Sequence, residues 1–437
     1  MNSLRFGLDG WIYGSCGLFG GDIVCHKTGA TVNCSNRDFR INPDTGVIQP
    51  ISGRTQQGRS RNDWGDWFGC SNGTLLRAIP SDDAYLVRNP QVPLTSPNGL
   101  IADANAHQLF PPENLVTFEL SGTPGKATSA CGMDIYRDVF LGDEYPGDAF
   151  TCEPVHQSVH RIDLSPAGHG FAGKRGAAEQ DREFLSSTDR WFRPVQARSG
   201  PDGALWVVDM YRYVIEHSRW IPKATLDDVD VFAGMGRGRI YRVLPSNTER
   251  ENVVPKLDSL SASELVELLN SPNGTVRDLV HQMLLWRSDD AFVPELQELI
   301  RSELSAIGAG HALSILITIG ALDETDLLTT IAVRDTELIR LSVQLSEPFL
   351  DQSSQLRNAV LQLAEHESPR VRRQVALSLG VLATKEAATT LVSLLRRNQH
   401  DAFVHSAALN SVTAATVPDV LSGYLALKSG EQSDLIQ

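Results

Sequence analysis

Two clusters of polar residues in the first part of the chain have side chains that could carry acid–base chemistry. The first is His156 and His160, which lie four residues apart and share a face of a strand or of one helical turn. Such a pair could supply a general base or bind a metal ion. The alternative is that both histidines are hydrogen-bonded parts of the protein core.

The second cluster follows the apolar stretch 204–208 and contains Asp209, Arg212, Glu216 and His217. His217 beside Glu216 could act as an oriented base. The carboxylate oxygens of Asp209 could bind a metal ion such as calcium. The alternative is a structural ion-pair network that closes the end of this part of the chain.

The segment Arg59-Ser-Arg-Asn-Asp-Trp-Gly-Asp-Trp67 combines two arginines with two tryptophans. Guanidinium groups bind carboxylates in a bidentate manner and also stack on aromatic rings. The segment could therefore bind a planar cofactor or a sugar ring, with Arg59 and Arg61 as anion clamps. Its carboxylates, Asp63 and Asp66, could bind calcium. The alternative is a solvated insertion.

Length and charge limit the classes of protein that can position these residues. The chain has 437 residues, which allows two to four domains, and 41% hydrophobic residues, which excludes wholesale disorder. No apolar run reaches the length of about 18 residues that spans a membrane. The excess of 53 Asp and Glu over 39 Lys and Arg argues against nucleic-acid binding. Residues 1–7 contain no apolar segment typical of a signal peptide.

Composition changes sharply after Pro245. The residues up to this point hold 28 of the 35 glycines, all six cysteines and six of the seven tryptophans. The net charge is −4 before the division and −10 after it. We therefore predict one domain at 1–245, a linker at 246–256 and a second domain at 257–437. No cysteines form Cys-x-x-Cys, and the six thiols are compatible with disulfides or with buried free cysteines.

A repeat of 31–33 residues predicts about five helical units after the linker. Val276-Arg277, Ile339-Arg340 and Val371-Arg372 mark three units, and Ile307 and Val404 mark two weaker ones. Partner helices are expected at 263–269, 292–300, 324–331, 355–364 and 387–395. The pattern resembles HEAT repeats, which stack into a continuous α-solenoid. The array could bind a protein partner, or it could be a packing module.

Short strand signals separated by turn residues predict β structure before the linker. Gly7-Leu-Asp-Gly-Trp-Ile-Tyr-Gly14 and Gly200-Pro-Asp-Gly-Ala-Leu-Trp-Val207 repeat one phrase, in which a tight turn leads into an aromatic strand. Further strands are expected at 31–36, 75–79, 115–118, 139–142, 158–164 and 239–243. The phrase resembles one in β-propellers of the sugar-dehydrogenase type. Blades of about 40–50 residues would give about five, a partial propeller whose first part is expected upstream of this chain.

Longer stretches strengthen the resemblance: residues 128–138, 152–161, 184–195, 200–222 and 238–243. They are similar to the membrane-bound dehydrogenase proteins of planctomycete-type bacteria. In that family a propeller similar to glucose and sorbosone dehydrogenases that use pyrroloquinoline quinone (PQQ) precedes HEAT-like repeats. A c-type cytochrome commonly follows, but the haem motif Cys-x-x-Cys-His does not occur here. The resemblance implies a periplasmic or exported protein.

The resemblance implies a quinone-dependent dehydrogenase that oxidises a sugar or another alcohol and passes electrons to a separate cytochrome c. His156 or His217 would be the catalytic base. Asp209 would bind Ca²⁺. The residues expected to hold PQQ are Arg59, Arg61, His160, Arg161, Arg193 and Arg212. The alternatives are a non-catalytic glycan- or protein-binding propeller whose HEAT scaffold docks a partner, and a fragment that does not fold on its own.

Overall fold

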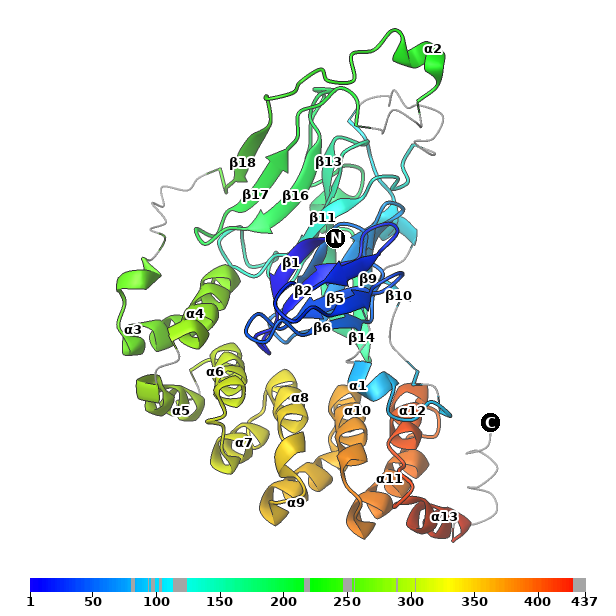
Figure 1. The fold of residues 1–437 in the computed structure, drawn as a ribbon, viewed down its shortest axis with the longest axis vertical. Helices are drawn as coiled ribbons and strands as arrows, with labels where there is room; N and C mark the ends of the chain where they lie inside the picture. Colours follow the sequence, from blue (N-terminus) through cyan, green and yellow to red (C-terminus); the bar gives the residue numbers. More distant parts are fainter. Residues whose placement is uncertain are drawn as a thin grey trace.

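The protein combines antiparallel β-sheets with a helical array. The computed structural model describes residues 1–79, 83–92, 94–95, 99–101, 104–112, 124–215, 221–246, 254, 256–287, 290–302 and 304–426. In Figure 1 the sheets occupy the upper part of the molecule, and the helices form an arc beneath them.

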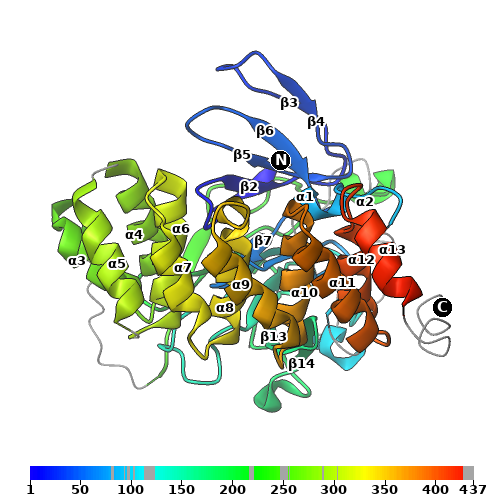
Figure 2. The same cartoon turned by 90° about the horizontal axis from the view of Figure 1, so that it is seen from below.

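The described strands form four antiparallel sheets and one separate hairpin. The first sheet contains β1 (Asn2–Phe6), β2 (Ile12–Ser15), β5 (Asp38–Ile41) and β6 (Ile48–Ile51). The hairpin, β3 (Asp22–Val24) and β4 (Thr31–Asn33), projects away from the helices (Figure 2). The second sheet contains β7 (Arg59–Arg61), β8 (Trp67–Ser71), β9 (Thr74–Ala78) and β10 (Gly99–Leu100).

The third and fourth sheets follow along the chain. The third contains β11 (Cys131–Ile135), β12 (Ala149–Glu153), β13 (Ser158–Ala167) and β14 (Gly170–Lys174), with β15 (Leu185–Ser186) beside β13. The fourth contains β16 (Pro194–Ser199), β17 (Leu205–Asp209) and β18 (Arg239–Val243). The first strand of each sheet contacts the first strand of the next sheet: β1 contacts β7, β7 contacts β11, and β11 contacts β16. These described strands do not form a closed ring.

The strand predictions succeed where apolar residues lie between turn residues. Strands occur within or close to the expected ranges 31–36, 75–79, 158–164 and 239–243. The strand expected at 139–142 is wrong, because these residues form a turn in which the Phe140 N–H donates to Asp138 at 3.1 Å. The range 115–118 lies outside the described residues. The described part contains four multi-stranded sheets, in place of the five blades expected from length.

The helices form two stacked layers. The inner layer, which faces the sheets, contains α4 (Gly274–Arg287), α6 (Ala306–Ile319), α8 (Thr336–Leu345), α10 (Pro369–Ser378) and α12 (Ala402–Asn410). The outer layer contains α3 (Ala262–Glu267), α5 (Val293–Arg301), α7 (Glu324–Ile331), α9 (Ser354–Gln362), α11 (Lys385–Arg397) and α13 (Val417–Leu425). The five repeat marks fall on the five inner helices, and the expected partner helices coincide with α3, α5, α7, α9 and α11 within a few residues.

Local sequence explains where these helices begin. Ser261 and Asp323 form capping boxes with Glu264 and Asp326, so the first backbone N–H groups of α3 and α7 have acceptors. Pro369 occupies the first turn of α10, where a missing N–H group costs nothing. Each inner helix contacts the next one along the array, and one hydrophobic core runs through the repeats from Leu265 to Ala408.

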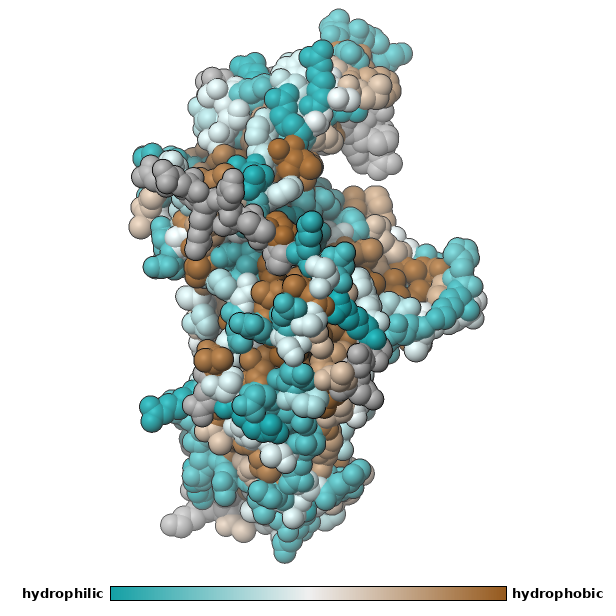
Figure 3. Space-filling view, turned by 90° about the vertical axis from the view of Figure 1, so that its left-hand side faces the viewer, coloured by the Kyte–Doolittle hydropathy of each residue, from teal (hydrophilic) through white to brown (hydrophobic). Residues whose placement is uncertain are grey.

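The surface and the cysteines complete the description. Figure 3 shows hydrophobic side chains as several separate patches among hydrophilic ones on the face drawn there. All six cysteines are free thiols, and five of them are buried, which agrees with the alternative of buried free thiols. Among the described residues, every helix is too short or too polar to span a bilayer.

Candidate functional site

The two predicted histidines lie in the core of the third sheet. His156 is fully buried; its Nε2 accepts the Gly125 N–H at 3.0 Å, and its Nδ1 lies 2.8 Å from Glu153 Oε2. His160 is also buried, with Nδ1 2.7 Å from Glu183 Oε2 and Nε2 2.7 Å from the Ala106 carbonyl. All four ring nitrogens therefore have protein partners. This arrangement fixes the connections around β13, and the role of His156 as a base stays a prediction.

Most of the arginines predicted to bind a cofactor contact other protein groups. Arg161 pairs with Asp148 at 2.6 Å and Glu179 at 3.1 Å. Arg193 donates to the carbonyls of Pro154, Arg212 and Tyr213, and Arg212 donates to the Phe232 carbonyl. The structure does not bring these arginines together around one cavity, and their cofactor role stays a prediction.

Asp209, the predicted metal ligand, lies at the end of β17. Asp209 Oδ1 accepts the backbone N–H groups of Arg193 and Tyr211 at 2.8 Å each, so it shapes the connection after β17. Its role as a calcium ligand stays a prediction. The described residues contain no group of three His, Cys, Asp or Glu side chains placed to hold a metal ion. His217 and Glu216 lie outside the described residues.

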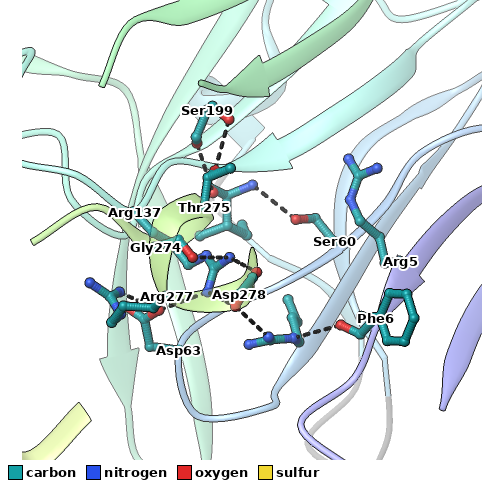
Figure 4. A network of polar contacts seen from close by, with 12 residues as sticks. Arg5, Phe6, Ser60, Asp63, Arg137, Ser199, Gly274, Thr275, Arg277 and Asp278 are labelled. Carbon is teal, nitrogen blue, oxygen red and sulfur yellow. Dashed lines mark hydrogen bonds and ion pairs between the residues drawn. The ribbon is translucent and has the colours of Figure 1, made fainter. Parts of the chain in front are cut away.

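The turn between β7 and β8 inserts between the sheets and the inner helices. Arg137 contacts Asp278 of α4 (Figure 4), and Arg61 lies 2.7 Å from the same carboxylate. Asp63 lies 2.8 Å from Arg137 and 2.6 Å from Arg277 of α4. Burial alone would raise the pKa of Asp63, but the guanidinium groups of Arg137 and Arg277 outweigh it and lower that pKa. Asp63 therefore holds two arginines at this junction, and its role as a calcium ligand stays a prediction.

The other end of the same turn contacts the next inner helices. Asp66 lies 3.5 Å from Arg340 of α8 and 3.0 Å from Arg370 of α10. Glu337 binds the same two arginines from the helical side, at 2.7 and 2.9 Å. Burial opposes ionisation of Asp66, but Arg340 and Arg370 lower its pKa below the usual value. The segment 59–67 therefore joins the two halves of the protein and is not a solvated insertion. Its role in binding a cofactor or a sugar ring stays a prediction.

Beside this turn, the sheets and helices enclose a cavity of about 400 Å³. Its β side carries Tyr13 from β2, Arg40 from β5, Arg59 from β7, Trp67 from β8 and Phe171 from β14. Its helical side is formed by residues of α6, α8, α10 and α1 (Asp83–Leu86). Of the described residues predicted to bind a ligand, four from the segment 59–67 line this cavity: Arg59, Trp64, Asp66 and Trp67.

Aromatic rings and a buried arginine form the β side of the cavity. The ring centroids of Tyr13 and Trp67 are 4.3 Å apart, and Arg59 lies 4.7 Å from the Trp67 centroid. Asp38, behind the wall, pairs with Arg59 at 2.6 Å. Burial lowers the pKa of Arg59, and Asp38 opposes this effect. The hydroxyl of Tyr13 donates to Asp9 at 2.8 Å, so a carboxylate also reaches this wall.

Three arginines form much of the helical side: Arg340, Arg370 and Arg373. Burial, together with the guanidinium groups of Arg340 and Arg370, lowers the pKa of Arg373 to about 10. At one corner of the cavity, His169 Nε2 lies 2.8 Å from Oδ2 of Asp401, the N-cap residue of α12. Burial lowers the pKa of His169, although the hydrogen bond to Asp401 opposes this shift.

Sequence reasoning missed most of this cavity because its lining comes from positions 7 to 377. Three signals did mark parts of it. The segment 59–67 was predicted to bind a cofactor or a sugar ring, and it contributes Arg59 and Trp67. Tyr13 belongs to the repeated Gly-x-Asp-Gly phrase, and Arg340 belongs to the repeat marks of the helical array. Nothing local indicated that these three signals meet at one cavity.

These observations define a class: a protein in which antiparallel sheets and a HEAT-like helical array enclose a polar, aromatic cavity. A family model described as a domain of unknown function (DUF7133) matches residues 1–247, more than half of the chain. The chain therefore belongs to this family. A model of HEAT repeats matches residues 350–412, which contain α9 to α12. A comparison with curated proteins gave no match.

Proposed function

We propose that this protein is a non-catalytic carbohydrate-binding protein whose site is the cavity between the sheets and the inner helices. The observation that carries the proposal is a cavity of about 400 Å³ that is lined by stacked aromatic rings and charged groups. This volume lies in the usual range of small-ligand sites, roughly 300–1,000 Å³. Most walls of the cavity come from regular strands and helices, which hold their side chains in fixed positions.

A sugar ring matches the chemistry of the two walls. Its C–H face is apolar and packs on aromatic rings such as Tyr13 and Trp67. Its hydroxyl groups both donate and accept hydrogen bonds. Asp9 and Asp83 supply acceptors and Arg40 supplies donors around the same cavity.

We further propose that the four sheets are blades of a partial β-propeller. The contacts of β1, β7, β11 and β16 in chain order support this, since the inner strands of neighbouring blades pack together in that architecture. In this arrangement the inner helices cover the propeller. The outer layer of the helical array, formed by α3, α5, α7, α9, α11 and α13, would then bind a protein partner.

One observation favours a second candidate, quinone-dependent oxidation of a sugar or alcohol. The guanidinium group of Arg59 over the Trp67 ring would also suit a planar, carboxylate-bearing quinone such as PQQ. In this candidate, electrons would pass to a separate cytochrome c in the periplasm.

The test is calorimetric titration of the full chain with a panel of mono- and disaccharides. Sugar binding is expected, and Trp67→Leu should weaken it at least tenfold, about 1.4 kcal/mol. Trp286→Leu is the matched control, because Trp286 is 65% exposed and does not line the cavity. Thermal unfolding of both variants shows whether they fold.

Two outcomes would overturn the proposal. One is that no sugar of the panel binds. The other is that the protein, supplied with PQQ, Ca²⁺ and an artificial electron acceptor, oxidises a sugar, which would establish the second candidate instead.

A further inference from the structure

One end of the helical wall is charged, and its charges are balanced within the protein. Arg340 of α8 and Arg370 of α10 line the cavity, and each contacts both Asp66 and Glu337. These ion pairs hold the β7–β8 turn against the inner helices. The next turn of α8 is neutral, and it faces the same cavity.

Gln344 presents an amide to the cavity from this last turn of α8. Its side chain is half-buried, and no group within the described part of the chain forms a hydrogen bond with it. A glutamine amide can donate two hydrogen bonds and also accept at its oxygen. Gln344 can therefore pair with a polar group of a ligand in this cavity.

Gln374 of α10 supplies a second amide, and this one is fixed in place. The residue is buried, and its Nε2 donates to the Tyr85 hydroxyl at 3.0 Å and to Ser378 Oγ at 3.1 Å. Both of its N–H groups are thus used by the protein, while the side chain also lines the cavity. What Gln374 can still offer is its oxygen, which only accepts. It therefore favours a ligand that brings an N–H or O–H donor.

Apolar side chains border Gln344 on the same wall. Leu341 lies three residues before it and shares its face of α8, and Ile317 of α6 also lines the cavity. Leu341 and Trp64 both reach within 3.3 Å of the position that a Cβ would take on Gly310, so they meet at one corner. A methyl group placed at this corner would be removed from water, which favours binding.

We infer that the bound sugar carries an acetamido group, which is bound by the amides and the apolar corner of the helical wall. This inference rests on the proposed carbohydrate site. An acetamido group has one carbonyl acceptor, one N–H donor and one methyl group. Gln344 donates to its carbonyl, Gln374 accepts its N–H, and its methyl group packs against Leu341. The sugar ring packs on Tyr13 and Trp67 of the opposite wall.

The experiment compares matched ligands. The full chain is titrated calorimetrically with the methyl glycosides of glucose and galactose, and with their 2-amino, 2-formamido and 2-acetamido forms. In at least one series the acetamido sugar should bind about tenfold more tightly than the parent sugar and the amine. The formamido sugar keeps the amide but lacks the methyl group, so it should bind about fourfold more weakly than the acetamido sugar.

Variants locate the preference. Gln344→Met removes the amide at nearly unchanged volume and should lower the affinity for the acetamido sugar about tenfold, which abolishes the preference. Gln355→Met, which replaces an exposed glutamine of α9, is the matched control and should keep it. Thermal unfolding shows that each variant is folded.

The outcomes separate this inference from the proposed function. Equal affinity for acetamido and parent sugars in both series, or a preference that Gln344→Met leaves intact, would overturn the acetamido ligand while the carbohydrate site stands. Absence of binding by every sugar would overturn both.

Discussion

At the residue scale, buried charged side chains in the sheets are held by partners within the protein. Asp38 is fully buried and accepts hydrogen bonds from the Cys16 and Thr55 N–H groups, the Thr55 hydroxyl and Arg59. His156 and Glu153 form a similar buried unit in the third sheet. Removing one member of such a unit leaves the other desolvated without compensation, which is costly.

We therefore expect Asp38→Asn to lower the free energy of unfolding by about 3–5 kcal/mol, because Arg59 loses its buried counter-charge. Chemical denaturation measures the change. Asp181→Asn is the control, since the Asp181–Arg182 pair is exposed and should contribute little. Equal effects of the two substitutions would contradict the prediction.

His156→Gln tests the two interpretations of that histidine. If the residue is structural, the substitution should lower the free energy of unfolding by about 2–3 kcal/mol, since Glu153 keeps a buried charge with a poorer donor. Urea denaturation measures this, alongside the sugar oxidation assay. An unchanged stability together with lost oxidation would instead support the predicted catalytic base.

At the element scale, two features determine how the sheets pack. The β7–β8 turn joins the sheets to the helices, and the backbone at Gly58 packs closely against the third sheet. The β7–β8 turn presents Asp63 to α4 and Asp66 to α8 and α10. Before this turn, Gly58 has φ of +133° and lies against the third sheet. These features connect elements that are distant along the chain.

Replacing both Asp63 and Asp66 with Asn should loosen the contact between the turn and the inner helices. Asparagine is neutral, so Arg277 loses the carboxylate of Asp63, and Arg340 and Arg370 keep only that of Glu337. Hydrogen exchange is expected to become faster in residues 62–66 and in the first turns of α4 and α10. Asp44→Asn, in an exposed turn of the first sheet, is the control. Exchange unchanged at these helices would show that the turn does not hold them.

Gly58→Ala should destabilise the protein strongly, because the added Cβ would lie 2.5 Å from the Cys70 sulfur and 2.8 Å from the Met133 nitrogen. The positive φ adds strain for any side chain. Gly168→Ala is the matched comparison: its φ is also positive, but nothing lies within 4 Å. We expect a loss of about 1 kcal/mol for Gly168→Ala and a clearly larger loss for Gly58→Ala. Thermal and urea unfolding measure both.

At the scale of the whole molecule, the junction between sheets and helices is rich in buried ionisable groups. His281 of α4 and His311 of α6 approach each other at 3.0 Å between their Nδ1 atoms. Burial lowers the pKa of His281 to about 3 and that of His311 well below its usual value. Arginines lower the pKa of Asp63, Asp66 and Asp278 despite their burial.

The protein should therefore lose stability as the pH falls. The folded-state pKa of both histidines is lower than the unfolded value of about 6.5, so the unfolded state binds protons that the folded state does not. Their effect is absent above pH of about 6.5 and grows below it, by up to about 1.4 kcal/mol per pH unit for each histidine. The carboxylates add to the loss below pH of about 4.

Urea unfolding between pH 7.5 and 4.5, a range chosen around the histidine value of about 6.5, measures this dependence. Replacing His281 and His311 with Asn should flatten it, whereas His400→Asn at an exposed position should not. A wild-type stability that is constant over this range would contradict the low histidine pKa values.

The sequence by itself determined the local elements. The inner and outer helices follow the predicted repeat because a period of 3.6 residues and helix caps are properties of short segments. The strand at 239–243 was predicted with its observed bounds for the same reason. The strand expected at 139–142 failed, because three apolar residues in a short segment, Val139-Phe-Leu141, do not reveal that Asp138 fixes a turn.

Tertiary structure alone decided what the charged residues do. The segment 59–67 has the same composition whether it binds a cofactor, lies in solvent or joins two parts of the protein. Its partners Arg277, Arg340 and Arg370 lie more than 200 residues further along the chain. The cavity likewise depends on Tyr13 and Arg373 meeting across the junction. Local sequence patterns carry no information about contacts of this separation, which arise only when the repeats stack and cover the sheets.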